Sequence, residues 1–428
     1  MNILTDAARV AGMTVVLLFR LGKLLGWPRS AAVLGTVTAV AWLFAQRRRR
    51  RAASRPAPRP RAPAVKPSVR WTPARAAVTV AGALLLLAVG ALHGITATAA
   101  SSIPALAVLW LFTPAPLVFA ARVARRWTRF RTLSTAYLAA SAVLSVIVLA
   151  AVGWEGSERG LHPAPPDDLP LLEDYPNLAA ALEEVEFPSA DGTILSGWFI
   201  SGTTPRTIAL VHGFGEERHQ MLPHADFLHD AGYSTLLFDL RSRGESEGEE
   251  VSFGYHESGD LQGAVQYIKQ RPDTGGDSVG VLGLSMGGAA AIIAAADTPE
   301  IKAVVAESTF SSVDSAVASS FEHFIDLPAF PFAPVTVFIL ERRLGISSDD
   351  VVPADYVADI SPRAVFIIHG RDDVTIVPED GIALHEAAGE PKEPLWLIEG
   401  AAHSEGVDVA PDEYARRVLS FFDRHLPQ

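Results

Sequence analysis

The apolar residues of this chain follow different patterns in its two halves. Before residue 155 they form long runs that contain almost no charge and show no polar face. After residue 181 they form short runs rich in Val, Ile, Leu and Phe, separated by segments with helical periodicity. The first pattern predicts helices surrounded by apolar material, and the second predicts strands that alternate with helices. The chain therefore divides into two regions of different class.

Four long apolar runs are candidates for membrane spans. Three contain about 20 residues, enough to cross a hydrocarbon core of about 30 Å, and the fourth is shorter. They cover residues 30–46, 76–94, 103–121 and 132–152. Because buried helices of a soluble domain would show a polar face, we expect these runs to cross a membrane. The stretch from Val10 to Trp27 contains Arg20 and Lys23, and it fits either a fifth span or an interfacial helix.

Charge divides the chain at the same place. Residues 1–154 contain 20 Lys and Arg and one acidic residue, whereas residues 155–428 contain 16 basic and 47 acidic residues. The basic residues cluster in an Arg- and Pro-rich linker at 47–75 and again at 122–131. Short loops this basic stay in the cytoplasm. We therefore expect an integral protein of the cell membrane, with residues 95–102 as an outer hairpin and the acidic half outside the cytoplasm.

The rest of the composition mainly excludes kinds of chemistry. The chain has no cysteine, which excludes disulfides, thiolate metal sites and a cysteine nucleophile. Its scattered histidines lack a ligand pattern, so we predict no metal and no cofactor. The Arg- and Pro-rich linker is typical of a solvated spacer that attracts anionic lipid headgroups, and we expect membrane lipids as partners and no nucleic acid.

The alternating pattern of the second half predicts one α/β domain at residues 182–428, after a linker at 155–181. We expect an opening antiparallel pair and then a mostly parallel sheet with helices on both faces. The predicted strands are 182–187, 194–201, 207–211, 234–240, 278–284, 301–307, 364–369 and 394–398. The alternation breaks at 311–350, where Phe and Pro are frequent. This segment is expected to be a short cap, either a buried connector or a lid over a pocket.

A serine follows the fifth predicted strand in the sequence Gly283-Leu284-Ser285-Met286-Gly287. An ordinary strand-to-helix turn can have the same five letters. The apolar strand before Ser285 and the Ala-rich helix after it favour a nucleophile elbow, a sharp turn that exposes the hydroxyl beside helix N-terminal amides. The two glycines leave room for that turn. Ser285 is therefore a candidate nucleophile.

A serine hydroxyl needs a base to remove its proton and a third group to orient that base. His403 follows the last predicted strand, and Asp373 follows the strand before it. We assign His403 as the base and Asp373 as the acid. The neighbouring Asp372 and the buried-strand residue Glu307 remain alternatives for the acid.

The oxyanion formed by attack on a carbonyl must be met by preorganised donors. The backbone N–H of Met286, immediately after the nucleophile, is one candidate. The loop after the strand at 207–211 supplies the other, the N–H of Phe214. For His212, in the same loop, we expect a structural role. We expect a hydrogen-bonded turn beneath the site, and not a second catalytic centre, from Asp239, Arg241, Gly244 and Ser246.

These segments together resemble the α/β-hydrolase superfamily over about residues 180–427. The motifs that carry the resemblance are H-G-F-G at 212–215, F-D-L-R-S-R-G-E-S at 238–246, G-L-S-M-G-G at 283–288, H-G-R-D-D at 369–373 and G-A-A-H at 400–403. The segment 253–261 and the short cap resemble bacterial serine-aminopeptidase-like or lysophospholipase-like hydrolases. The resemblance implies a triad of Ser285, Asp373 and His403, with the amides of Phe214 and Met286 as the oxyanion hole.

The pattern as a whole predicts a membrane-anchored serine hydrolase that cleaves carboxylic esters, of small molecules or lipids, through an acyl-enzyme on Ser285. The same triad serves peptidases, thioesterases and acyltransferases, which are the near alternatives. An alternative of another class is a membrane-tethered binding domain without catalysis. The complete set of candidate residues favours the enzyme.

Overall fold

The structure is a computed structural model that describes residues 146–426 apart from 148, 167, 168, 275, 277 and 326. The predicted spans at 30–46, 76–94 and 103–121, the basic linker and all but the end of the run at 132–152 lie outside the described residues. Within the described part of the chain, no helix has both the length and the apolar character needed to cross a bilayer.

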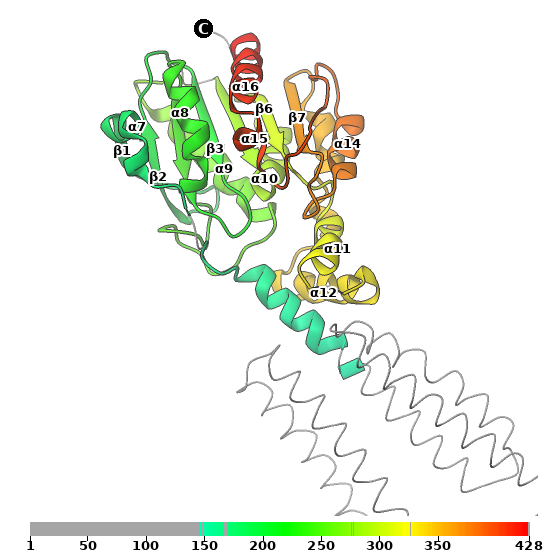
Figure 1. Cartoon of the computed structure of the whole chain (residues 1–428). Helices are drawn as coiled ribbons and strands as arrows, with labels where there is room; N and C mark the ends of the chain where they lie inside the picture. The colour runs from blue at the N-terminus through cyan, green and yellow to red at the C-terminus, as the bar shows by residue number, and fades with distance from the viewer. Residues whose placement is uncertain are drawn as a thin grey trace, which may run out of the picture. The chain divides into compact units, whose positions relative to one another are not determined.

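The described residues form an eight-stranded sheet with the order β1-β2-β4-β3-β5-β6-β7-β8 (Figure 1). β1 pairs antiparallel with β2 and β2 with β4, and all later pairs are parallel. The strands are β1 (Leu182–Pro188), β2 (Ile194–Ile200), β3 (Thr207–Val211), β4 (Ser234–Phe238), β5 (Val279–Leu284), β6 (Ile301–Glu307), β7 (Ala364–Gly370) and β8 (Trp396–Ile398). The predicted mostly parallel eight-stranded sheet is confirmed.

Helices cover both faces of the sheet. The described helices after residue 175 are α7 (Pro176–Ala181), α8 (Leu222–Asp230), α9 (Tyr255–Gln270), α10 (Met286–Asp297), α11 (Val313–His323), α12 (Ala329–Leu344), α13 (Pro353–Tyr356), α14 (Pro378–Ala387), α15 (Gly406–Val409) and α16 (Pro411–His425). Side chains of β3 show how two cores arise. Ile208 and Leu210 pack with α8 and α16, whereas Ala209 and Val211 pack with α9 and α10. Since alternate side chains point to opposite faces, an all-apolar strand serves both cores.

A helix precedes the sheet and packs on the domain. This leading helix (149–161) ends at Leu161, which is fully buried, and Leu178 of α7 is buried in the second core. A Cβ added at Gly153 would lie 2.7 Å from Val335 Cγ1 of α12, so the two helices are in close contact. The segment 155–181, expected as a linker, thus contains regular structure that contributes to both cores.

The segment predicted as a cap folds as the two helices α11 and α12, between β6 and β7. The rings of Phe321 and Phe332 stack with centroids 6.2 Å apart, and both side chains are buried in the main core. The start of the cap is held by Asp380 of α14, whose carboxylate accepts hydrogen bonds from Ser311 and Ser315. The inner faces of these helices are therefore an integral part of the domain.

Candidate active site

Ser285 lies at the turn between β5 and α10, with φ 53° and ψ −115°. This conformation is unfavourable for a residue with a side chain and costs about 1–3 kcal/mol, so the surrounding structure must hold it. Its N–H donates to the carbonyl of Glu307 at 2.8 Å, and the residue is 7% exposed. The serine thus projects from a turn that is fixed to the neighbouring strand.

The two glycines of the turn are required by close backbone contacts. A Cβ at Gly283 would lie 2.4 Å from the carbonyl oxygen of Gly287, and a Cβ at Gly287 would lie 2.3 Å from that of Val211. Contacts this short exclude any side chain. The geometry therefore explains the Gly-x-Ser-x-Gly pattern: the helix approaches the strands closely just after the serine.

His403 connects Ser285 to Asp373. Its Nδ1 lies 2.8 Å from Asp373 Oδ2, and its Nε2 lies 3.0 Å from Ser285 Oγ. Because a carboxylate only accepts hydrogen bonds, Nδ1 carries the proton and Nε2 is free to accept one from the serine hydroxyl. The three residues come from loops after β7 and β8 and from the turn after β5, and they meet at the carboxyl ends of the parallel strands.

The surroundings of Asp373 keep it ionised. Burial alone would raise its pKa, but hydrogen bonds from His369 and His403 and the amide of Ile376 hold the pKa well below its usual value. Its Oδ1 accepts the N–H groups of Thr375 and Ile376, both at 2.9 Å. The amides fix one carboxylate oxygen, which aims the other at His403.

The alternative acids point elsewhere. The side chain of Asp372 is exposed. Glu307 is buried, and its oxygens accept hydrogen bonds from the N–H of Gly406 and the hydroxyl of Tyr414. Burial raises the pKa of Glu307 above its ordinary value. Of the three carboxylates considered from the sequence, Asp373 is the one that contacts the histidine.

The loop after β3 lies against the nucleophile, because a Cβ at Gly213 would be 3.5 Å from Ser285 Cβ. His212 donates from Nδ1 to the carbonyl of Gly213 at 2.8 Å and accepts the Leu240 N–H at Nε2, 3.0 Å away. Burial lowers the pKa of His212 to about 4. The neutral ring therefore fixes this loop to the loop after β4, as expected of a structural residue.

Both candidate oxyanion donors are near this junction. Met286 is the first residue of α10, where the helix itself offers no carbonyl to accept its N–H. Phe214 follows Gly213, and its ring is 37% exposed and stacks on Phe253 with centroids 5.5 Å apart. Phe214 is thus the residue after the glycine that lies against Ser285, and its side chain is partly exposed.

Arg243 is a buried residue that the sequence analysis did not single out. Its guanidinium donates to the carbonyls of Glu216 and Pro163, each at 3.0 Å, and to that of Gly215. It therefore ties the loop that carries Phe214 to the segment after the leading helix. No local pattern predicts this, because all its partners are backbone carbonyls of distant segments.

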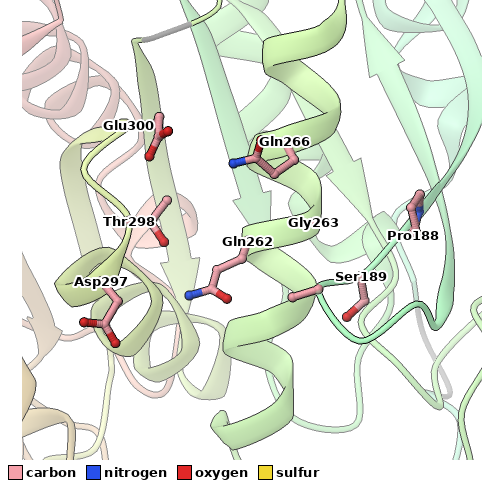
Figure 2. A pocket seen from close by; sticks show the side chains of 9 residues that line it. Pro188, Ser189, Gln262, Gly263, Gln266, Asp297, Thr298 and Glu300 are labelled. Carbon is pink, nitrogen blue, oxygen red and sulfur yellow. The ribbon is translucent and has the colours of Figure 1, made fainter.

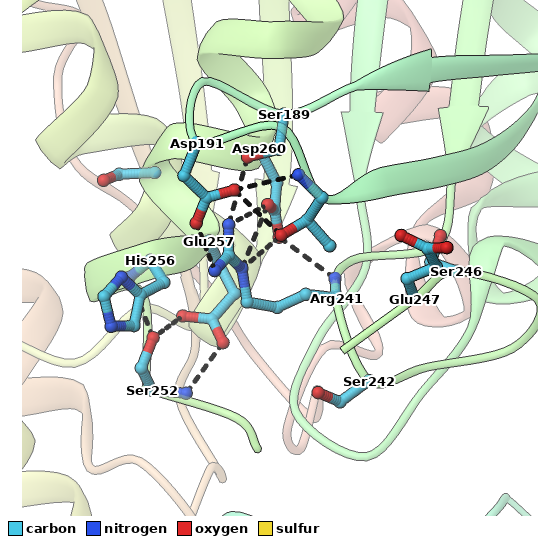
Figure 3. Close-up of polar contacts among 12 residues, drawn as sticks. Ser189, Asp191, Arg241, Ser242, Ser246, Glu247, Ser252, His256, Glu257 and Asp260 are labelled. Atoms are coloured by element: carbon cyan, nitrogen blue, oxygen red, sulfur yellow. Dashed lines mark hydrogen bonds and ion pairs between the residues drawn. The ribbon is translucent and has the colours of Figure 1, made fainter. Parts of the chain in front are cut away.

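The neighbouring Arg241 organises the turn expected beneath the site (Figure 3). It binds Asp260 of α9, with Nη2 2.6 Å from Oδ1, and reaches Asp191 Oδ2 at 2.9 Å. Its Nη2 also donates to Ser189 Oγ at 3.0 Å. These contacts join α9, the β1–β2 turn and the loop after β4, which indicates a structural role.

A surface hollow of about 410 Å³ does not include the serine in its lining. Figure 2 shows the side chains that line it. It is lined by the end of β1, the middle of α9 and the segment after α10, through residues that include Ser189, Gln262 and Glu300. None of the residues considered above for nucleophile, base, acid or oxyanion donors lines it. We assign the chemistry to the hydrogen-bonded serine and not to this hollow.

The domain is similar in sequence to several known proteins. Residues 203–337 match the sequence profile of the family described as serine aminopeptidase, S33. YqkD of Bacillus subtilis, an uncharacterized protein, is 28% identical over 241 residues, 55% of this chain and 77% of YqkD. The thiohydrolase aneE of Aspergillus aculeatus is 29% identical over 198 residues, 44% of this chain and 60% of aneE.

Among solved structures, the esterase Pf2001 of Pyrococcus furiosus is similar to this chain with a TM-score of 0.51 and 29% identity. The match covers 61% of this chain and 99% of the esterase. The similarity therefore extends over nearly the whole of that enzyme and corresponds to the C-terminal domain of the present chain.

Proposed function

We propose, on the premise that the C-terminal domain belongs to the α/β-hydrolase superfamily, that this protein is a serine hydrolase that cleaves carboxylic esters. The observation that carries the proposal is the continuous hydrogen-bonded series from Asp373 through His403 to Ser285. A serine within hydrogen-bond reach of an oriented imidazole is the arrangement needed for nucleophilic attack on a carbonyl.

In the proposed reaction, Ser285 Oγ attacks the ester carbonyl carbon while His403 Nε2 takes the hydroxyl proton. The tetrahedral intermediate then collapses, the imidazolium returns the proton to the alkoxide leaving group, and an acyl-enzyme remains on Ser285. A water molecule, deprotonated by the same nitrogen, attacks the acyl-enzyme, and the imidazolium returns the proton to Ser285 Oγ as the carboxylic acid is released. Asp373, ionised throughout, supports the positive charge on His403 in both steps.

The amides of Met286 and Phe214 are the proposed donors to the oxyanion. Met286 directly follows Ser285. Phe214 directly follows Gly213, where a Cβ would be 3.5 Å from Ser285 Cβ. Preorganised amides at such a position typically contribute about 100- to 1,000-fold to the rate each. The buried guanidinium of Arg243 supports this arrangement by holding the carbonyls of the same loop.

Apolar surroundings favour an ester of an acyl chain as substrate. Phe214, in the loop after β3, stacks its ring on that of Phe253. Gly213 of the same loop lies against Ser285. Phe253 in turn meets the leading helix, since a Cβ at Gly160 would be 2.8 Å from its Cζ. The similarity to an esterase agrees with this choice. Thioester cleavage is the second candidate, favoured by the relative named as a thiohydrolase.

Membrane anchoring is part of the proposal. It is supported by the uncharged runs before residue 155, by the basic segments between them and by the acidic half that follows. The basic segments favour a cytoplasmic position for the loops and an extracytoplasmic position for the hydrolase domain. The substrates we expect are therefore lipid or other esters at the outer surface of the membrane.

The function is tested by covalent labelling of membranes that contain the full chain. A fluorophosphonate probe phosphonylates activated serines, so wild type should be labelled and Ser285→Ala should not. Ser420→Ala, at an exposed position on α16, is the matched control and should be labelled like wild type. Absence of labelling in folded wild-type protein would refute the hydrolase and leave the binding-domain alternative.

The bond that is cleaved is tested in the same preparation with p-nitrophenyl esters of increasing chain length, an acyl thioester and an aminoacyl amide. The proposal expects the esters to have the highest kcat/KM. Faster turnover of the thioester or the amide would favour a thioesterase or a peptidase over an esterase. Ser285 would remain the proposed nucleophile.

The backbone role of Phe214 gives a prediction with paired variants. Phe214→Pro removes the N–H and should lower kcat by about 100- to 1,000-fold. Phe214→Ala keeps the N–H and should retain most of kcat, with its effect mainly on KM because the exposed ring is lost. Steady-state kinetics on one ester compares the two. Equal losses of kcat would show that the ring, and not the amide, matters.

A further inference from the structure

One stripe of the cap helix α12 presents apolar side chains to the outside. Pro334 and Phe338, four residues apart, are both exposed, and Phe338 is 54% exposed. Phe330 at the start of the helix is 80% exposed, and Phe324 at the end of α11 is 65% exposed. Large apolar patches on a protein surface mark sites that contact another apolar phase. The opposite side of α12, with Phe332 and Leu340, is buried in the main core.

The leading helix lies beside α12 (Figure 1). A Cβ at Gly153 would lie 3.0 Å from Ile339 Cδ1 of α12, and Arg343 binds Glu158 at 2.7 Å. Trp154 is 55% exposed, and the guanidinium of Arg343 lies 4.7 Å from the centre of its ring. The patch therefore continues from α12 onto the leading helix, whose first residues are the end of the predicted span at 132–152.

The charge of the patch is opposite to that of its domain. Residues 155–428 contain 47 acidic and 16 basic residues, and such a surface repels anionic lipid. On the exposed stripe of α12, however, Phe338 is followed four residues later by Arg342, whose guanidinium lies 5.0 Å from the Phe338 ring. Aromatic and basic side chains in this combination are typical of the membrane interface.

We propose that the exposed stripe of α12, together with Phe324 and Trp154, lies in the lipid headgroup region of the membrane that anchors the chain. This inference rests on the proposed anchoring, because the predicted span at 132–152 continues into the leading helix. A helix packed beside the end of a span is held at the bilayer surface. Its outward apolar stripe then contacts acyl chains, and its arginine contacts lipid phosphates.

This placement specifies the substrate class of the proposed esterase. Leu340 on the buried side of α12 lies near the leading helix, 3.6 Å from a Cβ at Gly160. The same position of the helix meets Phe253, which stacks on Phe214 beside the nucleophile. Apolar side chains thus connect the membrane-facing helix to the site. The expected substrates are amphiphilic esters whose acyl chain reaches the site from the lipid phase.

The absence of cysteine allows a direct test. Three single-cysteine variants of the full chain carry the environment-sensitive fluorophore NBD: Phe338→Cys on the stripe, Val146→Cys in the predicted span and Val409→Cys on α15. The last two positions are exposed, by 65% and 44%. Each variant is reconstituted in vesicles of phosphatidylcholine and phosphatidylglycerol, with unmodified or brominated acyl chains. Hydrolysis of a short soluble ester verifies that each variant is folded.

We expect the probes at 338 and 146 to emit at shorter wavelength than the probe at 409, and to lose emission in brominated lipid. The probe at 409 should instead be quenched by aqueous iodide. If 146 is quenched by brominated lipid and 338 is not, the chain is anchored and the inference is wrong. If neither is quenched, the anchoring itself is wrong, whatever the esterase activity shows.

A second copy of the chain is the other occupant that the test distinguishes. In that case the probe at 338 would shift to shorter wavelength only at high protein density and would be insensitive to bromine in the lipid. This result would also overturn the inference. A further expected result is that Phe338→Ser lowers kcat/KM for a long-chain ester in vesicles more than for a short soluble ester.

Discussion

Replacing His403 by alanine is expected to lower kcat for ester hydrolysis by about 10⁴- to 10⁶-fold. The variant loses the nitrogen that lies 3.0 Å from Ser285 Oγ, and no base then takes the hydroxyl proton. The rate that remains comes from binding and from the oxyanion amides. The same variant should react very slowly with the fluorophosphonate probe, because labelling also requires an activated serine.

The matched control for this prediction is His425→Ala, which removes a histidine from α16 near Glu393. Its kcat should stay within about threefold of wild type, because this half-buried side chain lies outside the triad. A His403→Ala variant with more than a tenth of wild-type kcat would contradict the assignment of the base.

Asparagine at position 373 is expected to lower kcat by about 10⁴-fold with little change in structure. Asp373 Oδ2 accepts a hydrogen bond from the Nδ1–H of His403 at 2.8 Å. An amide nitrogen at this position would favour the wrong tautomer of the ring and would not support the imidazolium. Because the pKa of Asp373 is held far below its usual value, the acid limb of the pH profile in wild type should not report this carboxylate.

The two other carboxylates considered from the sequence serve as controls for this prediction. Asp372→Asn changes an exposed side chain and should keep kcat within about threefold. Glu307→Gln preserves an acceptor for the Gly406 N–H and should also remain active. Steady-state kinetics of all three variants on one ester makes the comparison. A large loss of kcat in either control, with full activity in Asp373→Asn, would show that the carboxylate changed in that control is the acid of the triad.

The strands were predictable because local composition is sufficient for a sheet covered on both faces. Every residue of β3 is buried, so the chain shows a short all-apolar run there. The start of α9 leaves a weaker pattern in the sequence. This helix begins at Tyr255 after Gly254, whose φ is 107°. The side chain of Glu257 accepts the Gly254 N–H at 2.8 Å, and this cap extends the helix over polar residues.

The candidate site was also largely predictable, since polar residues at the ends of parallel strands meet at one edge of a sheet. Sequence order placed Ser285 and His403 there. It favoured Asp373 as the acid but left Asp372 and Glu307 open, because local pattern does not determine the directions in which side chains of a loop point. The amides of Thr375 and Ile376 make that choice by binding one oxygen of Asp373.

The sequence by itself determined the α/β class, the eight strands and the serine at its turn, because burial on both faces and tight turns leave periodic or glycine-marked patterns. Only the tertiary structure decided that the leading helix packs on α12 and that one stripe of the cap faces outward. The tertiary structure also decided that Arg243 ties the loop after β3 to the segment after the leading helix. These features depend on contacts between segments far apart in the chain. Such contacts leave no period in the sequence, and an apolar helix looks the same whichever of its sides is buried.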